Sequence, residues 1–537
     1  MATTGTSAPA SAWAPLRVRA FRFLWIAQLS SMIGTWMQTV GAQWLLVGEP
    51  NAPTLVALVQ TAAMLPTLLL ALPAGALADI LDRRRLLIWA QLFQVGVGAG
   101  LTMLAVIGRV PPAVLLTLTF LLGCGSTLTI PAYQVLAAEL VPQAQVRSAS
   151  ALNGVAQNLA RAVGPAIAGV LIAQVGVAAV FALNAASFVV LAAVLAGVPR
   201  PAAEGGVLPE RFGGALLVGA RYVRHSRAVR RILLRIVLFV VPAAALWALL
   251  PLVAERLLGL DAGGYGLLLA ALGIGAVIGA AVRPRVAARL SPNKLVLIAG
   301  LVFAVTTMVC VLVPILVVVL LALVPAGMAW LTLLATLSGT LQVFLPRWVR
   351  ARGLSIYQIF FAGGQALASV AWGVLAQLVG LVPTLLAAGA LLAAGAVTVG
   401  IWPLRDISGL NRDPAVYWPE PDLHNEPDLD EGPVLVTLTY TVQLEQVSLF
   451  LAAMQPVHRT RLRTGAASTA LYRDGADPTR FVEVSLYPTW AEHLRQHRGR
   501  LTGADRALDA AAEAMADGPP TVQHLLPARS DPADWTT

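Results

Sequence analysis

The sequence predicts an all-α polytopic membrane protein of twelve transmembrane helices in two parallel six-helix repeats, followed by a C-terminal cytosolic ferredoxin-like α+β domain. Three observations support this fold class: an apolar composition, basic residues confined to alternate connections, and an internal repeat. Of 537 residues, 58% are hydrophobic and 12% are charged, a balance typical of polytopic membrane proteins and unlike that of soluble proteins. Both cysteines, Cys124 and Cys310, lie in apolar runs, so no disulfide framework is indicated.

Twelve apolar stretches are long enough to cross the hydrocarbon core of a bilayer, which takes about 20 helical residues. The first six are expected at 21–47, 54–78, 86–108, 112–140, 149–174 and 177–198. The other six are expected at 232–257, 263–283, 294–313, 315–345, 353–379 and 382–402. The first stretch is not followed by a small-residue cleavage site, so we interpret it as a retained helix and not as a signal peptide.

The basic residues predict the orientation of these helices. Arginines and a lysine crowd one set of connections, namely 83–85, 147, 199–231, 283–294 and 347–352. The alternate set holds only Arg109 and Arg256. Because basic loops face the cytoplasm, both termini are expected there. The net charge of +10 is then mainly a topology signal with some attraction to membrane lipid, and it requires no nucleic-acid partner.

A shift of 204 residues aligns the two halves. It places Gly75 on Gly279, Pro142 on Pro346, and Gly169 on Gly373. Three matches at one offset, in corresponding topological places, favour a duplication over a coincidence of small and apolar residues. Parallel halves related by an axis along the membrane normal, with a substrate site between them near the midplane, are an architecture of transporters.

The cytoplasmic connection after the second helix carries a charged motif. Its residues are Gly75, Leu77, Asp79, Arg83 and Arg84. The motif resembles the signature between helices 2 and 3 of the major facilitator superfamily, although Ile80 and Asp82 depart from that pattern. The resemblance implies a latch that closes the cytoplasmic side, in which Asp79 accepts hydrogen bonds from a helix N-terminus or an arginine. Positive-inside anchoring alone is the alternative for the arginines.

Arg161 is expected near the bilayer midplane, where an ionisable residue is costly and is therefore a functional candidate. The neighbouring helices offer no carboxylate at that depth, so its partner is either an anionic substrate or backbone carbonyl groups. In the second case Arg161 only ties helices together. Asn158 shares its helical face, and Gln365 is its counterpart in the repeat.

Other polar and aromatic residues of the spans are candidates to line a substrate pocket. They are Trp36, Gln38, Gln94, Tyr133 and Tyr357. Such a lining suits an amphipathic organic molecule, although each residue could equally form a helix–helix hydrogen bond. No histidine lies in any span, so the candidates for proton coupling are Asp79, Glu139 or the substrate itself.

Gly164, Pro165 and Gly169 resemble part of the helix-5 motif of exporters in the same superfamily. The resemblance implies close helix packing and a bend that shapes alternating access. The fourth span carries Gly123–Ser126 where many proton-coupled drug exporters have an arginine, so their proton-relay scheme does not transfer directly.

After the last span the composition changes, and a small α+β domain is predicted. Its strands are expected at 434–441, 468–472, 481–487 and 521–526, and its helices at 444–461, 490–497 and 505–515. This order is ferredoxin-like and resembles small cofactor-free monooxygenase-like domains that pair into dimers. Trp490, His493, His497, Arg498 and Asp505 offer aromatic and acid–base groups, but we interpret the two histidines as a polar helix face. We therefore expect a dimerisation or regulatory module, through which two copies of the chain form a homodimer.

The predicted organisation has seven parts. They are a cytosolic tail (1–20), a first half (21–198), a central loop (199–231), a second half (232–403), a Pro- and acid-rich linker (404–433), the ferredoxin-like domain (434–527) and a tail (528–537).

The whole arrangement, including the segment 494–506, resembles the bacterial transmembrane secretion effectors of the major facilitator superfamily, whose relatives include the enterobactin exporter. The resemblance implies a secondary active exporter of siderophore- or drug-like molecules in the bacterial cytoplasmic (inner) membrane, proton-coupled, without cofactor, metal or catalytic residues. The alternatives are an importer of a small organic solute, or a transporter fused to an active cofactor-free monooxygenase.

Overall fold

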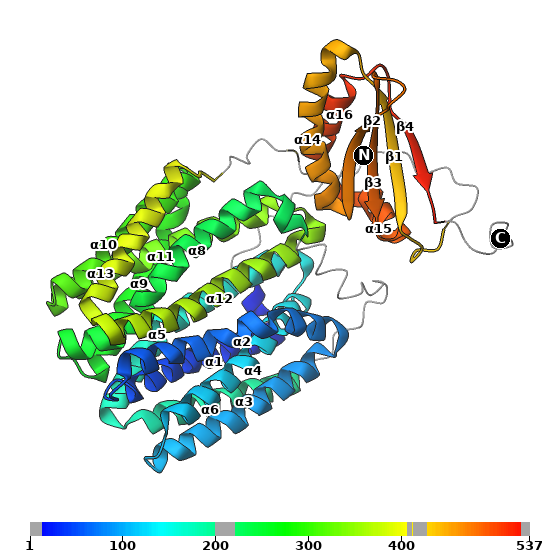
Figure 1. Ribbon diagram of the computed structural model, residues 1–537. Coiled ribbons are helices and arrows are strands. Elements are labelled where there is room, and N and C mark those ends of the chain that lie inside the picture. Colours follow the sequence, from blue (N-terminus) through cyan, green and yellow to red (C-terminus); the bar gives the residue numbers. More distant parts are fainter. Residues whose placement is uncertain (1–12, 199–220, 405–410, 412–426, 528–537) are drawn as a thin grey trace, which may run out of the picture. The chain divides into compact units, whose positions relative to one another are not determined.

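The computed structural model describes residues 13–198, 221–404, 411 and 427–527, and the chain divides into two compact units. The first unit comprises residues 1–207, 233–338 and 355–403, and therefore contains most of both predicted halves. The second unit comprises residues 208–232, 339–354 and 404–537. Figure 1 shows the first unit as a bundle of long helices and the second as a small sheet with helices. Parts of the predicted tails, central loop and linker lie outside the described residues, namely 1–12, 199–220, 405–410, 412–426 and 528–537.

Each of the twelve predicted spans coincides with a long helix. The first half contains α1 (Arg19–Leu45), α2 (Ala52–Ile80), α3 (Arg83–Val106), α4 (Pro112–Glu139), α5 (Val146–Gln174) and α6 (Val177–Gly197). The second half contains α8 (Arg227–Leu252), α9 (Ala262–Ala287), α10 (Pro292–Leu312), α11 (Leu316–Phe344), α12 (Arg347–Val379) and α13 (Leu381–Val397). Among the described residues, 11 helices are long and apolar enough to cross a membrane. The exception is α1, which carries Arg19, Arg22 and several amide and hydroxyl side chains.

Helix boundaries repeat between the two halves. Gly176 separates α5 from α6 with a φ of +100°, and Gly380 separates α12 from α13 with a φ of +94°. These glycines stand 204 residues apart, the offset at which the sequence repeats. A positive φ is accessible to glycine at little cost, so both halves use the same residue to turn the chain between their last two helices.

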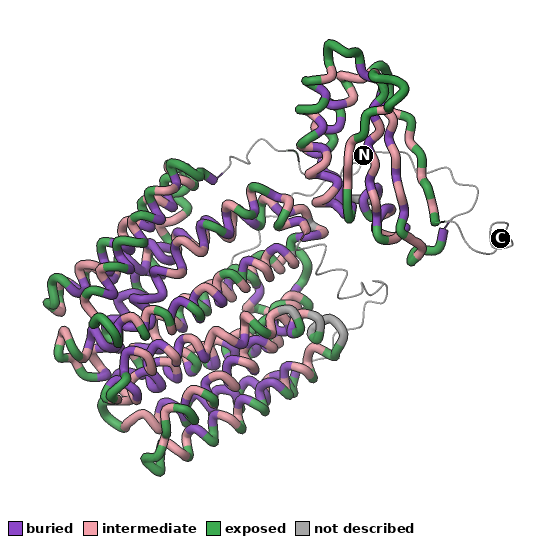
Figure 2. The backbone as a smooth tube through the Cα atoms, in the orientation of Figure 1, coloured by how far each residue is buried: buried purple, intermediate pink, exposed green. Residues whose placement is uncertain are grey.

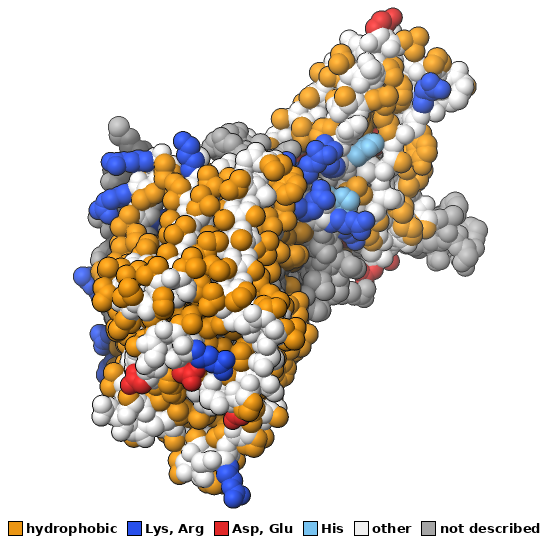
Figure 3. All heavy atoms as spheres, turned by 60° about the vertical axis from the view of Figure 1, so that its left-hand side comes forward, with side chains coloured by type: hydrophobic (Ala, Val, Ile, Leu, Met, Phe, Trp, Pro, Cys, Tyr) orange, Lys and Arg blue, Asp and Glu red, His pale blue; other side chains and the backbone are white. Residues whose placement is uncertain are grey.

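The surface of the helical unit is apolar. Large exposed hydrophobic side chains include Trp89, Met103, Val170, Leu321 and Leu378, each more than half exposed. Figure 3 shows a broad face of hydrophobic side chains on this unit, with charged side chains at its margins. Figure 2 shows the buried residues between the helices. A contiguous exposed apolar surface of this kind is suited to lipid.

The C-terminal part of the second unit is an α+β domain around one antiparallel sheet. Its strands are β1 (Val434–Thr441), β2 (Ser468–Arg473), β3 (Arg480–Tyr487) and β4 (Thr521–Leu525), in the spatial order β2-β3-β1-β4. Its helices are α14 (Val447–Thr464), α15 (Trp490–Arg495), which continues as a π-helical turn (Gln496–Arg500), and α16 (Gly503–Glu513). Val434, Val436, Leu438 and Tyr440 alternate into the core along β1, as expected for a strand with one buried face. The predicted element order is confirmed.

Candidate functional site

Four helices from both halves contribute a chain of aromatic side chains that begins at Arg161 on α5. The guanidinium of Arg161 on α5 lies 5.4 Å from the centre of the Trp36 ring on α1. The rings continue from Trp36 to Trp247 on α8 at 6.1 Å, from Trp247 to Trp330 on α11 at 5.3 Å, and from Trp330 to Phe361 on α12 at 6.2 Å. We call Trp36, Trp247, Trp330 and Phe361 the aromatic cluster. A guanidinium over an indole face is attracted by about 0.5–2 kcal/mol, depending on how far it is desolvated.

Three hydrogen-bond donors at this cluster are buried and have no hydrogen-bond partner among the described residues. They are Nε of Arg161 and Nε1 of Trp247 and of Trp330. Trp247 is 7% exposed and Trp330 is 3% exposed. A buried donor without a partner costs about 1–3 kcal/mol, so such groups are rare in interiors and call for an explanation. An acceptor-rich ligand between the two halves would supply the missing acceptors.

The remaining predicted pocket residues of the first half make hydrogen bonds within that half. Tyr133 donates to Asn153 at 3.2 Å, and the Gln94 amide donates to Ser126 at 3.0 Å. Asn158 donates to the carbonyl of Gly154 one turn earlier, and Gln38 accepts from Asn184 at 3.4 Å. Except for the Asn158 bond, which lies within α5, these contacts tie neighbouring helices together, as polar groups do inside membranes. A direct role in substrate binding stays a prediction for all of them.

In the second half, Tyr357 and Gln365 both lie on α12 and are buried. Tyr357 donates to the carbonyl of Leu334 on α11 at 3.3 Å. Ser369, one turn after Gln365, is fully buried and its hydroxyl has no hydrogen-bond partner. The repeat counterpart of Arg161 is therefore the buried amide of Gln365, one turn from the Ser369 hydroxyl, which lacks a partner among the described residues.

Gly164, Pro165 and Gly169 lie where α5 meets other helices at backbone distance. A Cβ added to Gly164 would come 2.7 Å from Cβ of Trp36 on α1. A Cβ on Gly169 would come 2.9 Å from the carbonyl oxygen of Ala262 and 3.1 Å from Cα of Gly266, both on α9. Only a residue without a side chain allows such an approach, as small residues do between membrane helices. The helix-5 motif thus lies at a contact between the two halves.

The repeat places a second glycine contact in the equivalent position. A Cβ on Gly373 of α12 would come 2.5 Å from Cβ of Ala57 and 2.7 Å from the carbonyl oxygen of Pro53, both in the first turns of α2. Tyr265 of α9 adds a hydrogen bond of 2.7 Å to Gln43 of α1. All these contacts lie at the helix ends opposite the Gly75–Leu87 segment. The two halves are therefore packed against each other at that end.

The charged motif ties helices within the first half. Arg83 forms an ion pair with Glu139 of α4 at 2.5 Å, and Arg84 donates to the carbonyls of Leu195, at 2.8 Å, and Ala196 at the end of α6. A cation at a helix C-terminus is stabilising because the last carbonyls lack partners. Gly75 has open space around it, and Leu77 is 38% exposed. The side chain of Asp79 lies outside the described residues.

The structure contains a buried arginine that the sequence analysis missed. Arg235 on α8 is 2% exposed and donates four hydrogen bonds of 2.7–2.9 Å around the end of α13. Its acceptors are the carbonyls of Gly395, Thr398 and Trp402 and the hydroxyl of Thr398. Arg235 therefore donates hydrogen bonds to carbonyl groups at the end of α13, as Arg84 does at the end of α6. Residue 235 lies inside the span predicted at 232–257, but its charge was not considered there.

The α+β domain has a buried ion cluster. Arg461 on α14 pairs with Glu483 of β3 at 3.0 Å and with Asp509 of α16 at 3.0 Å, and the three side chains are at most 1% exposed. Two carboxylates share one guanidinium. Burial, with Glu483 nearby and despite Arg461, raises the pKa of Asp509 to about 6.

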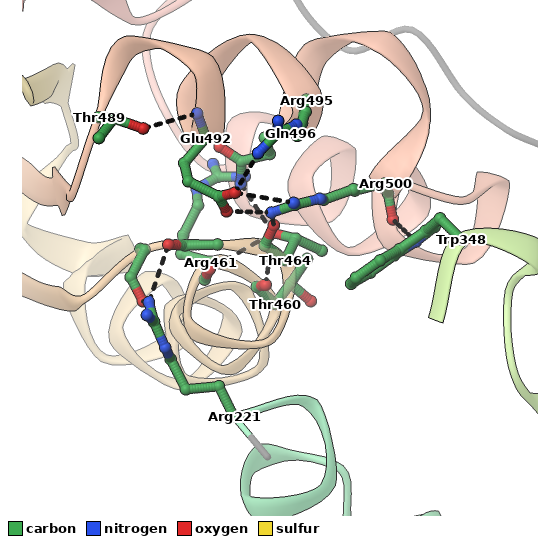
Figure 4. A network of polar contacts seen from close by, with 12 residues as sticks. Arg221, Trp348, Thr460, Arg461, Thr464, Thr489, Glu492, Arg495, Gln496 and Arg500 are labelled. Carbon is green, nitrogen blue, oxygen red and sulfur yellow. Dashed lines mark hydrogen bonds and ion pairs between the residues drawn. The ribbon is translucent and has the colours of Figure 1, made fainter. Parts of the chain in front are cut away.

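A second polar network of this unit is drawn in Figure 4. Glu492 accepts from Arg495 and Arg500 at 2.6 Å, and Arg500 also donates to the carbonyl of Thr464 at 3.0 Å. Burial alone would raise the pKa of Glu492, but the hydrogen bonds and charges of these two arginines lower it. Trp348 donates to the carbonyl of Arg500, and Arg221 donates to that of Gly465.

The interpretation of His493 and His497 as a polar helix face is wrong. His493 is 0% and His497 is 3% exposed, and the ring of His493 packs against those of Trp490 and His497. The helix is short, so a periodicity argument over two residues could not locate its solvent face. Asp505 is also buried and forms a capping box with Thr502 at the start of α16, whereas the side chain of Arg498 lies outside the described residues.

Residues 10–531 match the family described as transmembrane secretion effector. The chain belongs to this family of major facilitator superfamily transporters. It is 28% identical to an uncharacterized MFS-type transporter of Bacillus subtilis, over 33% of this chain and 41% of the relative. It is 26% identical to a staphyloferrin A transporter of Staphylococcus aureus, over 26% of this chain and 36% of that protein.

A multidrug efflux pump of Mycobacterium tuberculosis is 28% identical over 38% of this chain and 51% of its own length. The chain thus spans about half or less of the length of these relatives. Among solved structures, the fold is similar to that of the nucleoside transporter NupG, with a TM-score of 0.60 and 10% identity over 72% of this chain and 99% of the other. It is also similar to the inward-facing bacterial homologue of the lysosomal transporter Spinster, with a TM-score of 0.57 and 13% identity over 72% of this chain and 97% of the other. The protein is a multi-pass membrane transporter.

Proposed function

We propose that this transporter exports acceptor-rich, aromatic or anionic small organic molecules, of siderophore- or drug-like character, by alternating access. The observation that carries the proposal is the set of three unsatisfied donors on Arg161, Trp247 and Trp330 beside an aromatic cluster contributed by both halves. Stacking rings and a guanidinium together select planar molecules that carry oxygen acceptors or negative charge.

Export as the direction is supported by relatives of the chain. A macrolide efflux protein of Streptococcus pyogenes is 22% identical over 44% of this chain and 58% of its own length, and the efflux pump of Mycobacterium tuberculosis is similar as well. The staphyloferrin A transporter supports the siderophore-like substrate class. The placement of this chain in an enterobactin-exporter-like branch belongs to the same proposal.

The proposed cycle uses contacts at opposite ends of the helices. The glycine contacts at Gly169 and Gly373 close one end of the helical unit, and they must open when the Gly75–Leu87 end closes. Differential affinity of the substrate for the two states drives such an exchange. In the proposed orientation, both termini lie on the cytoplasmic side of a bacterial inner membrane, so the glycine contacts lie at the external end. The latch at Gly75–Leu87 then closes the cytoplasmic end in the outward-open state.

Proton coupling through Asp79 or Glu139 completes the proposal. Glu139 is 30% exposed at its side chain and pairs with Arg83, so protonating it would release Arg83 from α4. The test uses proteoliposomes with an imposed pH gradient. Neutralising the residue that couples protons, by Asp79→Asn or Glu139→Gln, should abolish gradient-driven transport and leave downhill exchange intact. Equal gradient dependence in the wild type and both variants would contradict coupling through either carboxylate.

The experiment that tests the function is an accumulation screen over siderophores, macrolides and aromatic dyes, with and without a proton gradient. Cells that express the protein should accumulate less of at least one acceptor-rich aromatic compound than cells that carry Arg161→Gln. Higher accumulation in the expressing cells would favour the second candidate, an importer.

For the C-terminal domain we propose a ferredoxin-like module that dimerises or regulates. The sheet order β2-β3-β1-β4 with two helical crossovers supports the ferredoxin-like class. A cofactor-free monooxygenase remains the second hypothesis because Trp490 and His493 lie together. Oxygen uptake by the full chain with aromatic substrates would favour the enzyme, whereas a dimer in detergent without oxygen uptake would favour the module.

A further inference from the structure

Three histidines of the α+β domain converge from two elements. His493 lies on α15, His497 on the π-helical turn that follows it, and His524 on β4. One ring nitrogen of each lies within 4.8 Å of those of the other two. The separation of four residues between His493 and His497 puts their rings on the same side of the helix, and β4 supplies the third ring.

The distances are close to those of a metal site. The Nε2 atoms of His493 and His497 are 3.1 Å apart. Two imidazole nitrogens bound to one tetrahedral Zn²⁺ at about 2.0–2.1 Å lie about 3.3 Å apart. The ring centres of His493 and His524 are separated by 4.8 Å. The ring centres of His497 and His524 are 6.3 Å apart, so His524 is the ligand that has to move closer when an ion binds.

The surroundings favour neutral imidazoles. The rings of Tyr487 and Trp490 pack against His493 at 4.9 and 5.2 Å and fix its orientation. His493 is fully buried and His497 nearly so, and burial disfavours the charged imidazolium form. Neutral imidazole is the form that ligates metals.

His524 also provides an opening and an unsatisfied atom. Its Nε2 is buried and has no hydrogen-bond partner in the described part of the chain. The residue itself is only half-buried, on the edge strand β4, which pairs with β1 alone. Solvent can therefore reach the cluster from the side of β4, and a water molecule can take a fourth coordination position.

We propose that His493, His497 and His524 bind a divalent late transition-metal ion of the Zn²⁺ class, with water as the fourth ligand. Three imidazoles suit Zn²⁺, Co²⁺, Ni²⁺ and Cu²⁺ rather than the oxygen-preferring Mg²⁺ and Ca²⁺. The ion would join α15 to the edge strand β4, so binding stabilises the fold of this domain. The proposal is independent of the transported substrate.

The test uses the full-length protein in detergent, purified without a polyhistidine tag and stripped with a chelator. Co²⁺ is titrated in, and the visible absorption of a four-coordinate cobalt site is followed until it saturates. We expect saturation at one Co²⁺ per chain and loss of the absorption when Zn²⁺ is added. His524→Gln, on the half-buried edge strand, should weaken Co²⁺ binding by about 10- to 100-fold or more.

His458→Gln is the matched control, because His458 lies on α14 outside the cluster and its Nε2 is also buried without a hydrogen-bond partner. It should bind Co²⁺ like the wild type. A zinc X-ray absorption spectrum of the wild type, with three imidazole nitrogens at about 2.0 Å, supports the site even if the variants fail to fold. Substoichiometric binding by the wild type, or wild-type affinity in a folded His524→Gln variant, would overturn the proposal and leave only the packed imidazoles of His493, His497 and His524.

Discussion

The guanidinium carbon of Arg161 lies 5.4 Å from the centre of the Trp36 ring, while Nε of Arg161 is buried without a hydrogen-bond partner. The sequence left two partners open for this arginine, an anionic substrate or backbone carbonyls. Its aromatic contact and its unsatisfied nitrogen favour the first. Nε of Arg235 also lacks a partner among the described residues, but the two terminal nitrogens of Arg235 donate four hydrogen bonds to groups at the end of α13.

This contrast predicts different consequences for the two arginines. Arg235→Met removes four charged hydrogen bonds and leaves buried carbonyls unpaired, so it should destabilise the protein by about 3 kcal/mol. Arg161→Met should leave thermal stability unchanged or raise it, because it removes a partly buried charge that has no ion-pair partner among the described residues. Thermal unfolding in detergent measures both, and a larger loss in Arg161→Met than in Arg235→Met would refute the assignment.

Removing the indole N–H groups of Trp247 and Trp330 should weaken substrate binding without impairing folding. Trp247→Phe and Trp330→Phe each keep an aromatic ring and remove an unsatisfied donor. Each should raise the transport KM for an acceptor-rich substrate by about 3- to 10-fold, since a hydrogen bond to such a group contributes about 1 kcal/mol. Trp402→Phe is a control at the end of α13. Unchanged KM values in both cluster variants would argue against the aromatic cluster as the binding site.

The glycine contacts predict a conformational effect. Gly169→Val places its side chain against the backbone of Ala262 and Gly266, so the closed end of the helical unit should open. In a background with Cys124 and Cys310 replaced by serine, a reporter Ala57→Cys at the Gly373 contact should react with a maleimide about tenfold faster. Gly154→Val lies on the same helix with open space around it and serves as the control. Equal labelling rates in the two variants would contradict the account.

The raised pKa of Asp509 predicts that the stability of the α+β domain depends on pH. The folded-state pKa of this carboxyl, about 6, exceeds the unfolded value near 3.8, so the folded state binds more protons between these values and stability falls as pH rises through that window. Asp509→Asn removes the buried negative charge. Hydrogen exchange of β1 in the full chain should be slower in the variant than in the wild type at pH 7.5, and nearly equal at pH 4. A variant less protected at pH 7.5 would show that the ionised carboxylate is stabilising.

The helical spans could be predicted from the sequence because each depends on local properties, length and hydropathy. The repeat was also visible, since Gly169 and Gly373 match at one offset and both prove to be backbone contacts between the halves. The burial of Arg235, His493 and His497 could not be predicted, because it depends on carbonyls and rings that come from distant parts of the chain. Gln94 shows the same limit. Its hydrogen bonds to Leu122 and Ser126 follow from how α3 and α4 pack, which its position in the sequence does not reveal.

The most direct test of the central claim is energised transport in inside-out membrane vesicles. The substrate is a fluorescent anionic aromatic dye, and the variants are wild type, Arg161→Lys and Arg161→Gln at equal amounts of folded protein. The account predicts proton-gradient-dependent uptake by wild-type vesicles, partial uptake with Arg161→Lys, and a loss of about tenfold or more with Arg161→Gln. Uptake by Arg161→Gln vesicles at the wild-type rate, or no gradient-dependent uptake by the wild type for any dye of this class, would contradict it.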